Sequence, residues 1–429
     1  MATHTLVRRR TLFEVHSWVG ITAGLMLFVI SWSGTVAVVS HEIDWLLNPT
    51  LRAPAAQTPI DWEAIMRRVT HHYPDWHIEE INEPLYPGFA VEVHATPPGS
   101  ARHRVYVDPT TVQVIGSTSY FNVQRFFRSF HMALFENDEG SFGGIPVGYY
   151  VVGVFSLFLL SSVISGLAFY RKWWRGLFML QTRHGARRLF ADLHKLTGLW
   201  QAWFGLLIGL TGFWYLLEWW VPEPPYVEVA SVAAPGTPSL NVTDLVQKAH
   251  VAYPELVIQR VGFYEDGVIT FEGDDGSTLV RKRAAYVSVD QRTGQVVALQ
   301  RPATLSAYDR WWETVDLLHF GKFGGVWSKA LYVVFGLALS GLCLTGAYLR
   351  AQRQRRDMIR REFRRSVYGA YGLTVLLMLY AVYGGYQEIK GYGTGNAWPE
   401  VPAPVLLFLL GWGAITLVVL GGWMRLVDR

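Results

Sequence analysis

Six long apolar runs constrain the fold of this 429-residue chain more than any other feature of its sequence. Each run has about 20 residues, the length that a helix needs to cross the hydrocarbon core of a bilayer. A soluble protein would have to bury all six, whereas 51% apolar residues and 18 tryptophans are typical of a membrane protein. We therefore expect an α-helical integral membrane protein with six transmembrane helices, at about residues 17–39, 148–169, 196–217, 329–349, 367–386 and 403–424.

Basic residues gather on one side of this six-helix arrangement. Arg8, Arg9 and Arg10 precede the first run, and the basic segments 171–188 and 350–365 join runs two to three and four to five. Positive charge in short loops stays in the cytoplasm, so both chain ends are expected there, in a bacterial inner membrane. The mixed-charge segments 40–147 and 218–328 are then periplasmic. The net charge of +4 follows from this topology and gives no reason to expect a nucleic-acid partner.

The first four runs and the long segments between them form two similar halves. We place the first repeat at 11–175 and the second at 187–352, each with the order helix, outer domain, helix. The outer domains, at about 42–125 and 219–310, each read as a small α+β unit, because an amphipathic helix ending at Tyr73-Pro74 or Tyr253-Pro254 precedes strand-like sequence. Asp61 and either Asn241 or Thr243 are candidate N-caps. Residues 363–429, with helices five and six, have no counterpart.

Four histidines recur at matching places in the two halves. His16 and His194 are each followed by glycine after four residues and by a Ser/Thr-Gly pair after 17 and 18. His131 and His319 precede the second helix of each half, although an insertion at 136–141 disturbs their register. The four Ser/Thr-Gly pairs are Ser33-Gly34, Ser165-Gly166, Thr211-Gly212 and Thr345-Gly346. The glycines could admit a flat macrocycle, or serve ordinary helix packing.

These features together resemble the PepSY-associated transmembrane family of bacterial inner-membrane proteins, which are often iron-regulated. The resemblance rests on the histidine-led first and third helices, the segment 42–49 (EIDWLLNP), the two Tyr-Pro outer segments, and Leu318-His319 before a glycine-rich helix, and it covers about residues 11–350. It implies two periplasmic PepSY-like domains. One branch of the family is similar to ferric-siderophore reductases that carry haem, so the resemblance implies haem-mediated electron transfer.

Histidine at membrane depth is costly and usually functional, and imidazoles from facing helices are suitable axial ligands for haem iron. Depth pairs His16 with His194 on an inner haem and His131 with His319 on an outer one. Pairing His16 with His131 would need ligands from opposite faces of a core roughly 30 Å thick. Cys343 is the only cysteine, so covalent attachment through Cys-x-x-Cys-His is excluded and both haems would be b-type.

Other interpretations of these residues stay open at this point. The four histidines could be interfacial residues bonded to backbone or lipid, and a zinc site is disfavoured because no carboxylate or cysteine accompanies them at ligand spacing. His41 is a reserve outer ligand. We expect the remaining histidines of the outer domains to be solvated: His71, His72, His77, His94, His103 and His250. Four arginines could either pair with haem propionates or anchor the helices at the membrane surface: Arg10, Arg125, Arg188 and Arg310.

The expected function is reduction of ferric iron in a periplasmic siderophore chelate, with release of ferrous iron. The sequence holds no flavin or nicotinamide motif, so an external donor, either a quinol or a cytoplasmic reductase, must supply the electrons. Helices five and six could pack against the bundle or give that donor access. The rival functions are a non-redox peptide- or siderophore-binding or regulatory protein, and a siderophore transporter, since transporters often contain repeats.

Overall fold

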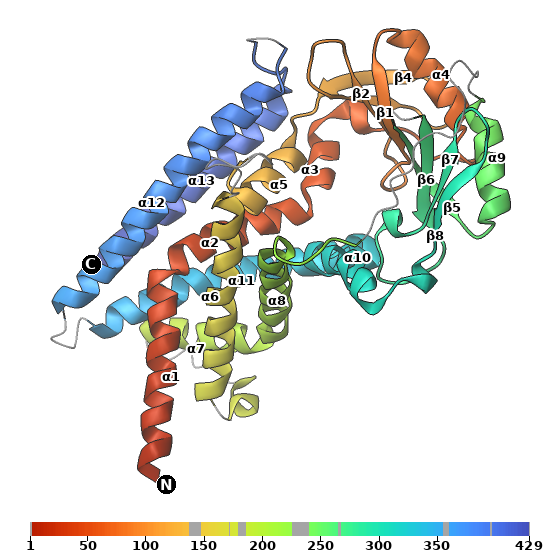
Figure 1. Ribbon diagram of the computed structural model, residues 1–429. Helices are drawn as coiled ribbons and strands as arrows, with labels where there is room; N and C mark the ends of the chain where they lie inside the picture. The colour runs from red at the N-terminus through yellow and green to blue at the C-terminus, as the bar shows by residue number, and fades with distance from the viewer. Residues whose placement is uncertain are drawn as a thin grey trace.

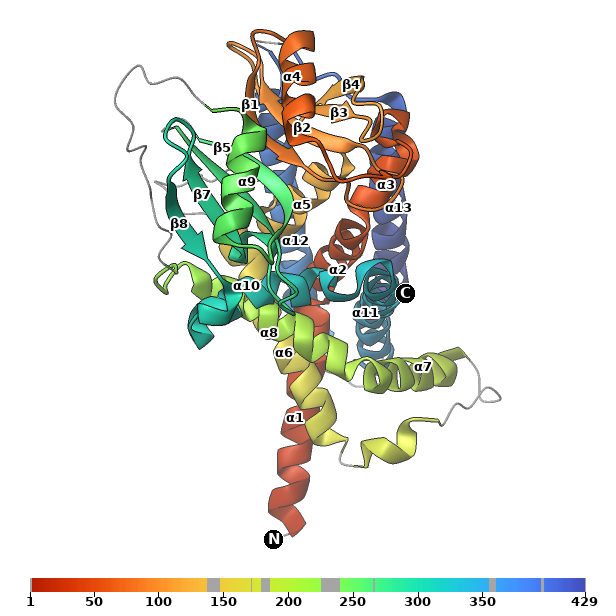
Figure 2. The same ribbon diagram turned by 90° about the vertical axis from the view of Figure 1, so that its right-hand side faces the viewer.

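The computed structural model describes residues 2–136, 147–170, 172–178, 186–224, 240–264, 267–354, 360–394 and 397–428. Within them, a group of long apolar helices carries a β-sheet domain at one end (Figures 1 and 2). Residues 137–141 of the insertion, and residues 171 and 179–185 of the basic segment 171–188, lie outside the described residues.

Within the described residues, four helices are each long and apolar enough to cross a membrane, as a membrane protein requires. They are α6 (Val147–Phe169), α11 (Gly325–Gln354), α12 (Arg360–Gly391) and α13 (Ala403–Asp428). Two further spans are reached if each of two bent helix pairs counts as one. The pairs are α1 (Ala2–Thr22) with α2 (Gly24–Val38), bent by 66°, and α7 (Ala186–Trp200) with α8 (Ala202–Glu218), bent by 63°.

The bends lie at Ala23 and Gln201, inside the runs 17–39 and 196–217 that we expected to form one helix each. Each break comes seven residues after a histidine, His16 or His194. The physical reason is tertiary: α1 packs on α6 while α2 packs on α11, and α7 packs on α11 while α8 packs on α6. Each bent helix pair therefore contacts both halves of the chain.

The strands form one continuous antiparallel sheet, in the order β4-β3-β2-β1-β5-β6-β7-β8. We had expected two separate α+β units; instead, β1 of the first unit pairs with β5 of the second, with Ile81 opposite Val261. The pairing satisfies backbone groups that would otherwise lie on two exposed sheet edges. The strands are β1 (His77–Asn82), β2 (Val91–Thr96), β3 (His103–Val107), β4 (Val114–Ser119), β5 (Val257–Phe263), β6 (Val268–Asp274), β7 (Tyr286–Asp290) and β8 (Val296–Gln300).

Two short helices, α4 (Trp62–His72) and α9 (Val242–Ala252), cover one face of the sheet, as Figure 2 shows. Their N-caps are Asp61, which accepts from the Ala64 amide, and Asn241, which accepts from the Asp244 amide. Strand alternation directs the apolar side chains toward these helices, where they are fully buried. They include Ile81, Val93, Val105, Val261, Phe271 and Val287.

The opposite face of the sheet carries charged side chains, and His94 is among them. We expected His94 to be solvated, but it is 7% exposed and its ring nitrogens lie 2.5 Å from Glu80 and 2.6 Å from Glu92. Burial lowers the pKa of His94, but hydrogen bonds to the two carboxylates outweigh burial and raise it to about 9. Glu92 lies two residues before His94 on the same face of β2, whereas Glu80 reaches His94 only because β1 pairs with β2.

Three further helices join the sheet to the membrane helices: α3 (Ser40–Leu47), α5 (Val123–Ala133) and α10 (Ala307–Phe320). Asp44 of α3 fixes the start of α5 by accepting 2.9 Å hydrogen bonds from the Val123 and Gln124 amides. Helices α5 and α10 carry His131 and His319 in their last turns, and each is followed by a left-handed residue, Leu134 or Gly321, that turns the chain.

Helices α12 and α13 pack against the rest of the bundle. Trp32 of α2 donates to Thr416, and Trp423 donates to the carbonyl of Leu344 in α11. Helices five and six were expected either to pack against the bundle or to give an electron donor access, and these contacts favour packing.

Candidate functional site

Two cavities among the apolar helices each contain one pair of the predicted histidines. The His16–His194 cavity has a volume of about 1110 Å³ and lies between α1, α6, α7 and α11. The His131–His319 cavity has a volume of about 540 Å³ and lies closer to the sheet domain. Leu27, Leu159 and Leu339 line both cavities, which therefore share a wall one side chain thick.

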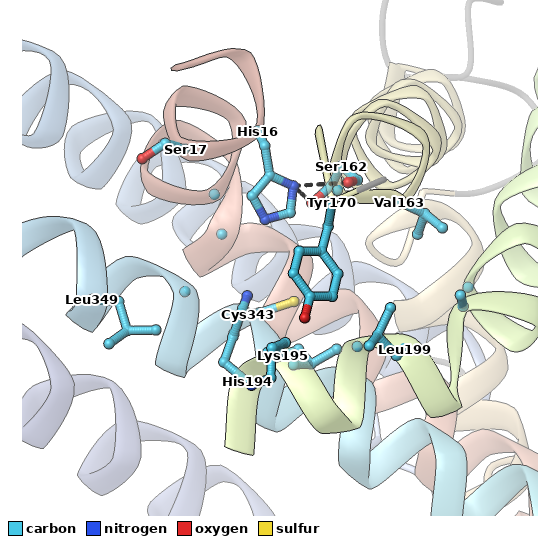
Figure 3. A pocket seen from close by; sticks show the side chains of 18 of the residues that line it. His16, Ser17, Ser162, Val163, Tyr170, His194, Lys195, Leu199, Cys343 and Leu349 are labelled. Carbon is cyan, nitrogen blue, oxygen red and sulfur yellow. Dashed lines mark hydrogen bonds between the residues drawn. The ribbon is translucent and has the colours of Figure 1, made fainter. Parts of the chain in front are cut away.

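His16 and His194 face each other from different halves of the chain (Figure 3). Their ring centroids are 6.3 Å apart. The Nδ1–H of His16 donates to the carbonyl of Ser162 at 2.8 Å. His194 Nδ1 lies 2.9 Å from the Thr345 hydroxyl, and because that hydroxyl donates to the Gly341 carbonyl, it accepts from the imidazole.

His131 and His319 repeat this arrangement in the second cavity, with ring centroids 6.2 Å apart. The Nδ1–H of His131 donates to the carbonyl of Ile30 at 3.0 Å. His319 Nδ1 lies 2.8 Å from the Thr211 hydroxyl, which itself donates to the Leu207 carbonyl and so accepts from the ring.

All four imidazoles are therefore held in the same tautomer. With the proton on Nδ1, the Nε2 atom of each ring keeps its lone pair, which is the form in which histidine binds a metal. A hydrogen bond from the other ring nitrogen is the usual outer-shell partner of a metal-bound histidine, because it fixes both tautomer and orientation.

The spacing of each pair suits two ligands on one metal. About 2 Å for each metal–nitrogen bond and about 1 Å from nitrogen to ring centroid give a separation of roughly 6 Å. Both observed separations, 6.3 and 6.2 Å, agree with this value. Among the described residues, no three His, Cys, Asp or Glu side chains gather as a metal site.

The Ser/Thr-Gly pairs of the sequence lie where they support these rings. Three glycines leave room for an imidazole, and at the fourth, Gly212, an added methyl would meet Ser156 instead. A methyl at the other three would lie 2.6 Å from His131 Cε1 (Gly34), 3.3 Å from His16 Cε1 (Gly166) and 3.0 Å from His194 Cε1 (Gly346). The repeated motif therefore leaves space on a helix surface for a histidine ring from another helix, a role that we did not expect from the sequence.

His41, the reserve ligand, lines neither cavity. It lies on α3, where burial first, and then nearby cations such as Lys322, lower its pKa to about 3. The structure gives it no partner role beside His131 or His319.

Of the four arginines that we considered for propionates, one lines a cavity. Arg188 borders the His16–His194 cavity and lies 3.6 Å from Asp192. Arg10 lines neither cavity, Arg125 pairs with Glu388 at 3.0 Å, and Arg310 donates to the Thr278 carbonyl. The cavities are lined instead by cations that the sequence did not single out: Arg187, Lys195 and Arg350 in the first, and Arg128, Arg281 and Arg283 in the second.

The sheet domain reaches the second cavity through Arg281, in the connection between β6 and β7. Its guanidinium contacts Glu313 at 2.7 Å and Asp316 at 2.6 Å on α10. Asp316 also accepts from the Tyr215 hydroxyl at 2.6 Å, and the Tyr215 ring lies 5.1 Å from the ring of His319. The network connects the sheet domain to the histidine pair below it.

Comparison with known proteins agrees with this architecture. An uncharacterized protein of Pseudomonas aeruginosa is 27% identical over 322 residues, which cover 66% of this chain and 78% of that protein. The model of the PepSY-associated TM region matches residues 13–353, which include both cavities, all four histidines and the whole sheet. The chain therefore belongs to the PepSY-associated transmembrane family.

Proposed function

We propose that this protein is a haem b-containing oxidoreductase that passes electrons across the bacterial inner membrane to ferric iron in a periplasmic siderophore chelate. The observation that carries the proposal is the common state of the four histidines. They form two facing pairs at metal-bridging distance, and every Nδ1–H is engaged so that every Nε2 is available.

The proposed topology counts each bent pair as one span, giving six, with both chain ends and the basic loops in the cytoplasm. The sheet domain is then periplasmic, the His16–His194 cavity is the inner site and the His131–His319 cavity the outer one. The element order supports an internal duplication: a bent helix, a short helix, four strands, a second short helix and a span occur in both halves. Each site would take one histidine from each half.

The residues present fit one b-type haem in each cavity. A haem held by Nε2 of a histidine pair supplies a one-electron carrier. Ser162 and Thr345 orient the inner pair, while Ile30 and Thr211 orient the outer one. Leu27, Leu159 and Leu339 line both cavities, so the two proposed haem sites are adjacent. Arg281 and its carboxylate partners close the outer cavity on the side where the ferric chelate would take up the electron.

The experiment follows electrons from the purified protein to a ferric chelate. The protein is reduced with dithionite, freed of excess reductant and mixed with a ferric hydroxamate, while a ferrous-specific dye records iron release. We expect reoxidation of the b-type spectrum with one ferrous ion formed per electron. H319L should slow the transfer at least tenfold and leave the inner spectrum in place.

H250Q, a change on the exposed side of α9, is the matched control and should transfer electrons at the wild-type rate. If the protein had no Soret band, or if its reduced spectrum did not change when a ferric chelate was added, a non-redox binding, regulatory or transport role would fit better.

A further inference from the structure

Within the described ranges, seven arginine and lysine side chains line the two histidine cavities. Five of them pair with carboxylates at nitrogen–oxygen distances of 2.7 to 3.6 Å: Arg188 and Lys195 with Asp192, Arg350 with Glu14, and Arg281 and Arg283 with Glu313. The guanidinium groups of the other two, Arg128 and Arg187, have no ion pair or hydrogen bond in that part of the chain. Each cavity therefore has one cation that no described carboxylate neutralises.

Both of these arginines lie on the face of a helix that also carries a histidine of the same cavity. Arg128 precedes His131 by three residues on α5, about 4.5 Å along the helix axis. Arg187 precedes His194 by seven residues on α7, two turns or about 10.5 Å away. Residues at these spacings share a helix face. Both side chains are exposed, so each lies at an open edge of its cavity.

The charges around Arg128 favour a bound anion. Arg128 repels Lys322, which follows His319 by three residues. The corresponding position of the second half, three residues before His319, holds Asp316, but this carboxylate already pairs with Arg281 at 2.6 Å. An anion bound beside Arg128 would relieve the repulsion between the two cations, and the attraction is stronger next to an apolar cavity than in water.

We propose that Arg128 and Arg187 bind the propionate carboxylates of the outer and the inner haem, respectively, and so position each macrocycle. This assignment rests on the proposed function and names further residues of those same sites. Haem is an apolar ring that carries two carboxylates at one edge, and the fork of guanidinium N–H groups matches a carboxylate. An unpaired arginine at the edge of an apolar cavity, on the helix of an axial histidine, suits that group.

The two arginines orient the haems in opposite directions. Arg128 lies on α5, beside the sheet domain, whereas Arg187 lies at the start of α7, at the far end of the bundle (Figures 1 and 2). The carboxylate edges then point away from each other. The apolar edges face the leucine side chains that line both cavities, which brings the two rings closest to one another where no charged group lies between them.

The test uses the full-length protein in lipid nanodiscs, with one histidine replaced so that each site is read alone. H194L leaves the outer site and H319L the inner one. Protein made in haem-deficient cells is loaded with haem b or with its dimethyl ester, whose carboxylates are neutral. With haem b, R128Q in H194L and R187Q in H319L should speed haem loss to apomyoglobin about 3- to 30-fold, the range for one charge-assisted hydrogen bond partly exposed to solvent.

Two further readouts separate propionate binding from a structural role. With the dimethyl ester, the same substitutions should leave the rate of loss unchanged, because no carboxylate remains for the arginine to bind. With haem b, R128Q should also lower the midpoint potential of the outer haem, since less positive charge then stabilises the reduced state. R128K keeps the charge and should restore most of the retention. The control is R67Q on α4, an exposed arginine that pairs with Glu63, which should lose haem at the wild-type rate.

Two results would overturn the assignment of either arginine. One is an unchanged rate of haem b loss in its glutamine variant. The other is equal acceleration with haem b and with the dimethyl ester, which would mean that the arginine supports the fold or binds a lipid phosphate. A protein that holds two haems but shows either result refutes this assignment alone, whereas a wild-type protein that takes up no haem refutes the proposed function as well.

Discussion

Replacing Gly34 by alanine should remove the outer haem and leave the inner one. The added Cβ would lie 2.6 Å from His131 Cε1, 3.0 Å from Nδ1 and 3.1 Å from Nε2. Carbon atoms in contact are normally about 3.5–4.0 Å apart, so the ring must move by about 1 Å. The ring is held on its other side by the Ile30 carbonyl, and overpacking of this kind costs about 1–3 kcal/mol. Moving the ring takes Nε2 out of line with His319.

The assay is haem content by pyridine haemochrome, with redox titration of the purified protein. G34A should fall from two haems per chain to about one, with a single remaining midpoint potential. The matched control is G372A in α12, which lines neither cavity, where an added methyl meets nothing within 4 Å and alanine favours the helix by about 1 kcal/mol. Two haems with unchanged potentials in G34A would refute the claim that His131 needs the space beside Gly34.

Three further predictions concern groups around the sites. Because the folded pKa of His94 is raised to about 9, its contribution to stability, about 3 kcal/mol, is fully present below pH 6.5 and lost as pH rises through 9. The unfolding midpoint should therefore fall over that window in the wild type but not in H94Q; equal pH profiles would contradict it. T211V should weaken haem retention at His319 about 10- to 100-fold without affecting the inner haem, read from haem loss to apomyoglobin. E388Q should lower stability by about 1–2 kcal/mol by uncoupling α12 from Arg125, seen as a lower unfolding midpoint, with both haems retained.

The histidine pairs could be predicted from sequence because the duplication repeats local spacing. His16 and His194 have the same distance to the following glycines, and depth in the membrane follows directly from position along a helix. The structure brings together both predicted pairs, including the one whose register the insertion disturbs. Local signals also predicted the caps at Asp61 and Asn241.

What could not be predicted depends on contacts between distant segments. The bend after each histidine arises because successive helix segments pack on different halves, and the single sheet arises from the pairing of Ile81 with Val261. The second carboxylate beside His94, that of Glu80, depends on the register between β1 and β2. The repeated Ser/Thr-Gly pairs were visible in the sequence, but their partners were not, because each supports a histidine on another helix.

The most direct test of the account is a haem count with single and paired ligand substitutions. We predict two b-type haems per chain in the wild-type protein, one in H194L, one in H319L with a different midpoint potential, and none in the double variant. Two haems remaining after both substitutions, or a wild-type protein that takes up none when haem is in excess, would contradict it.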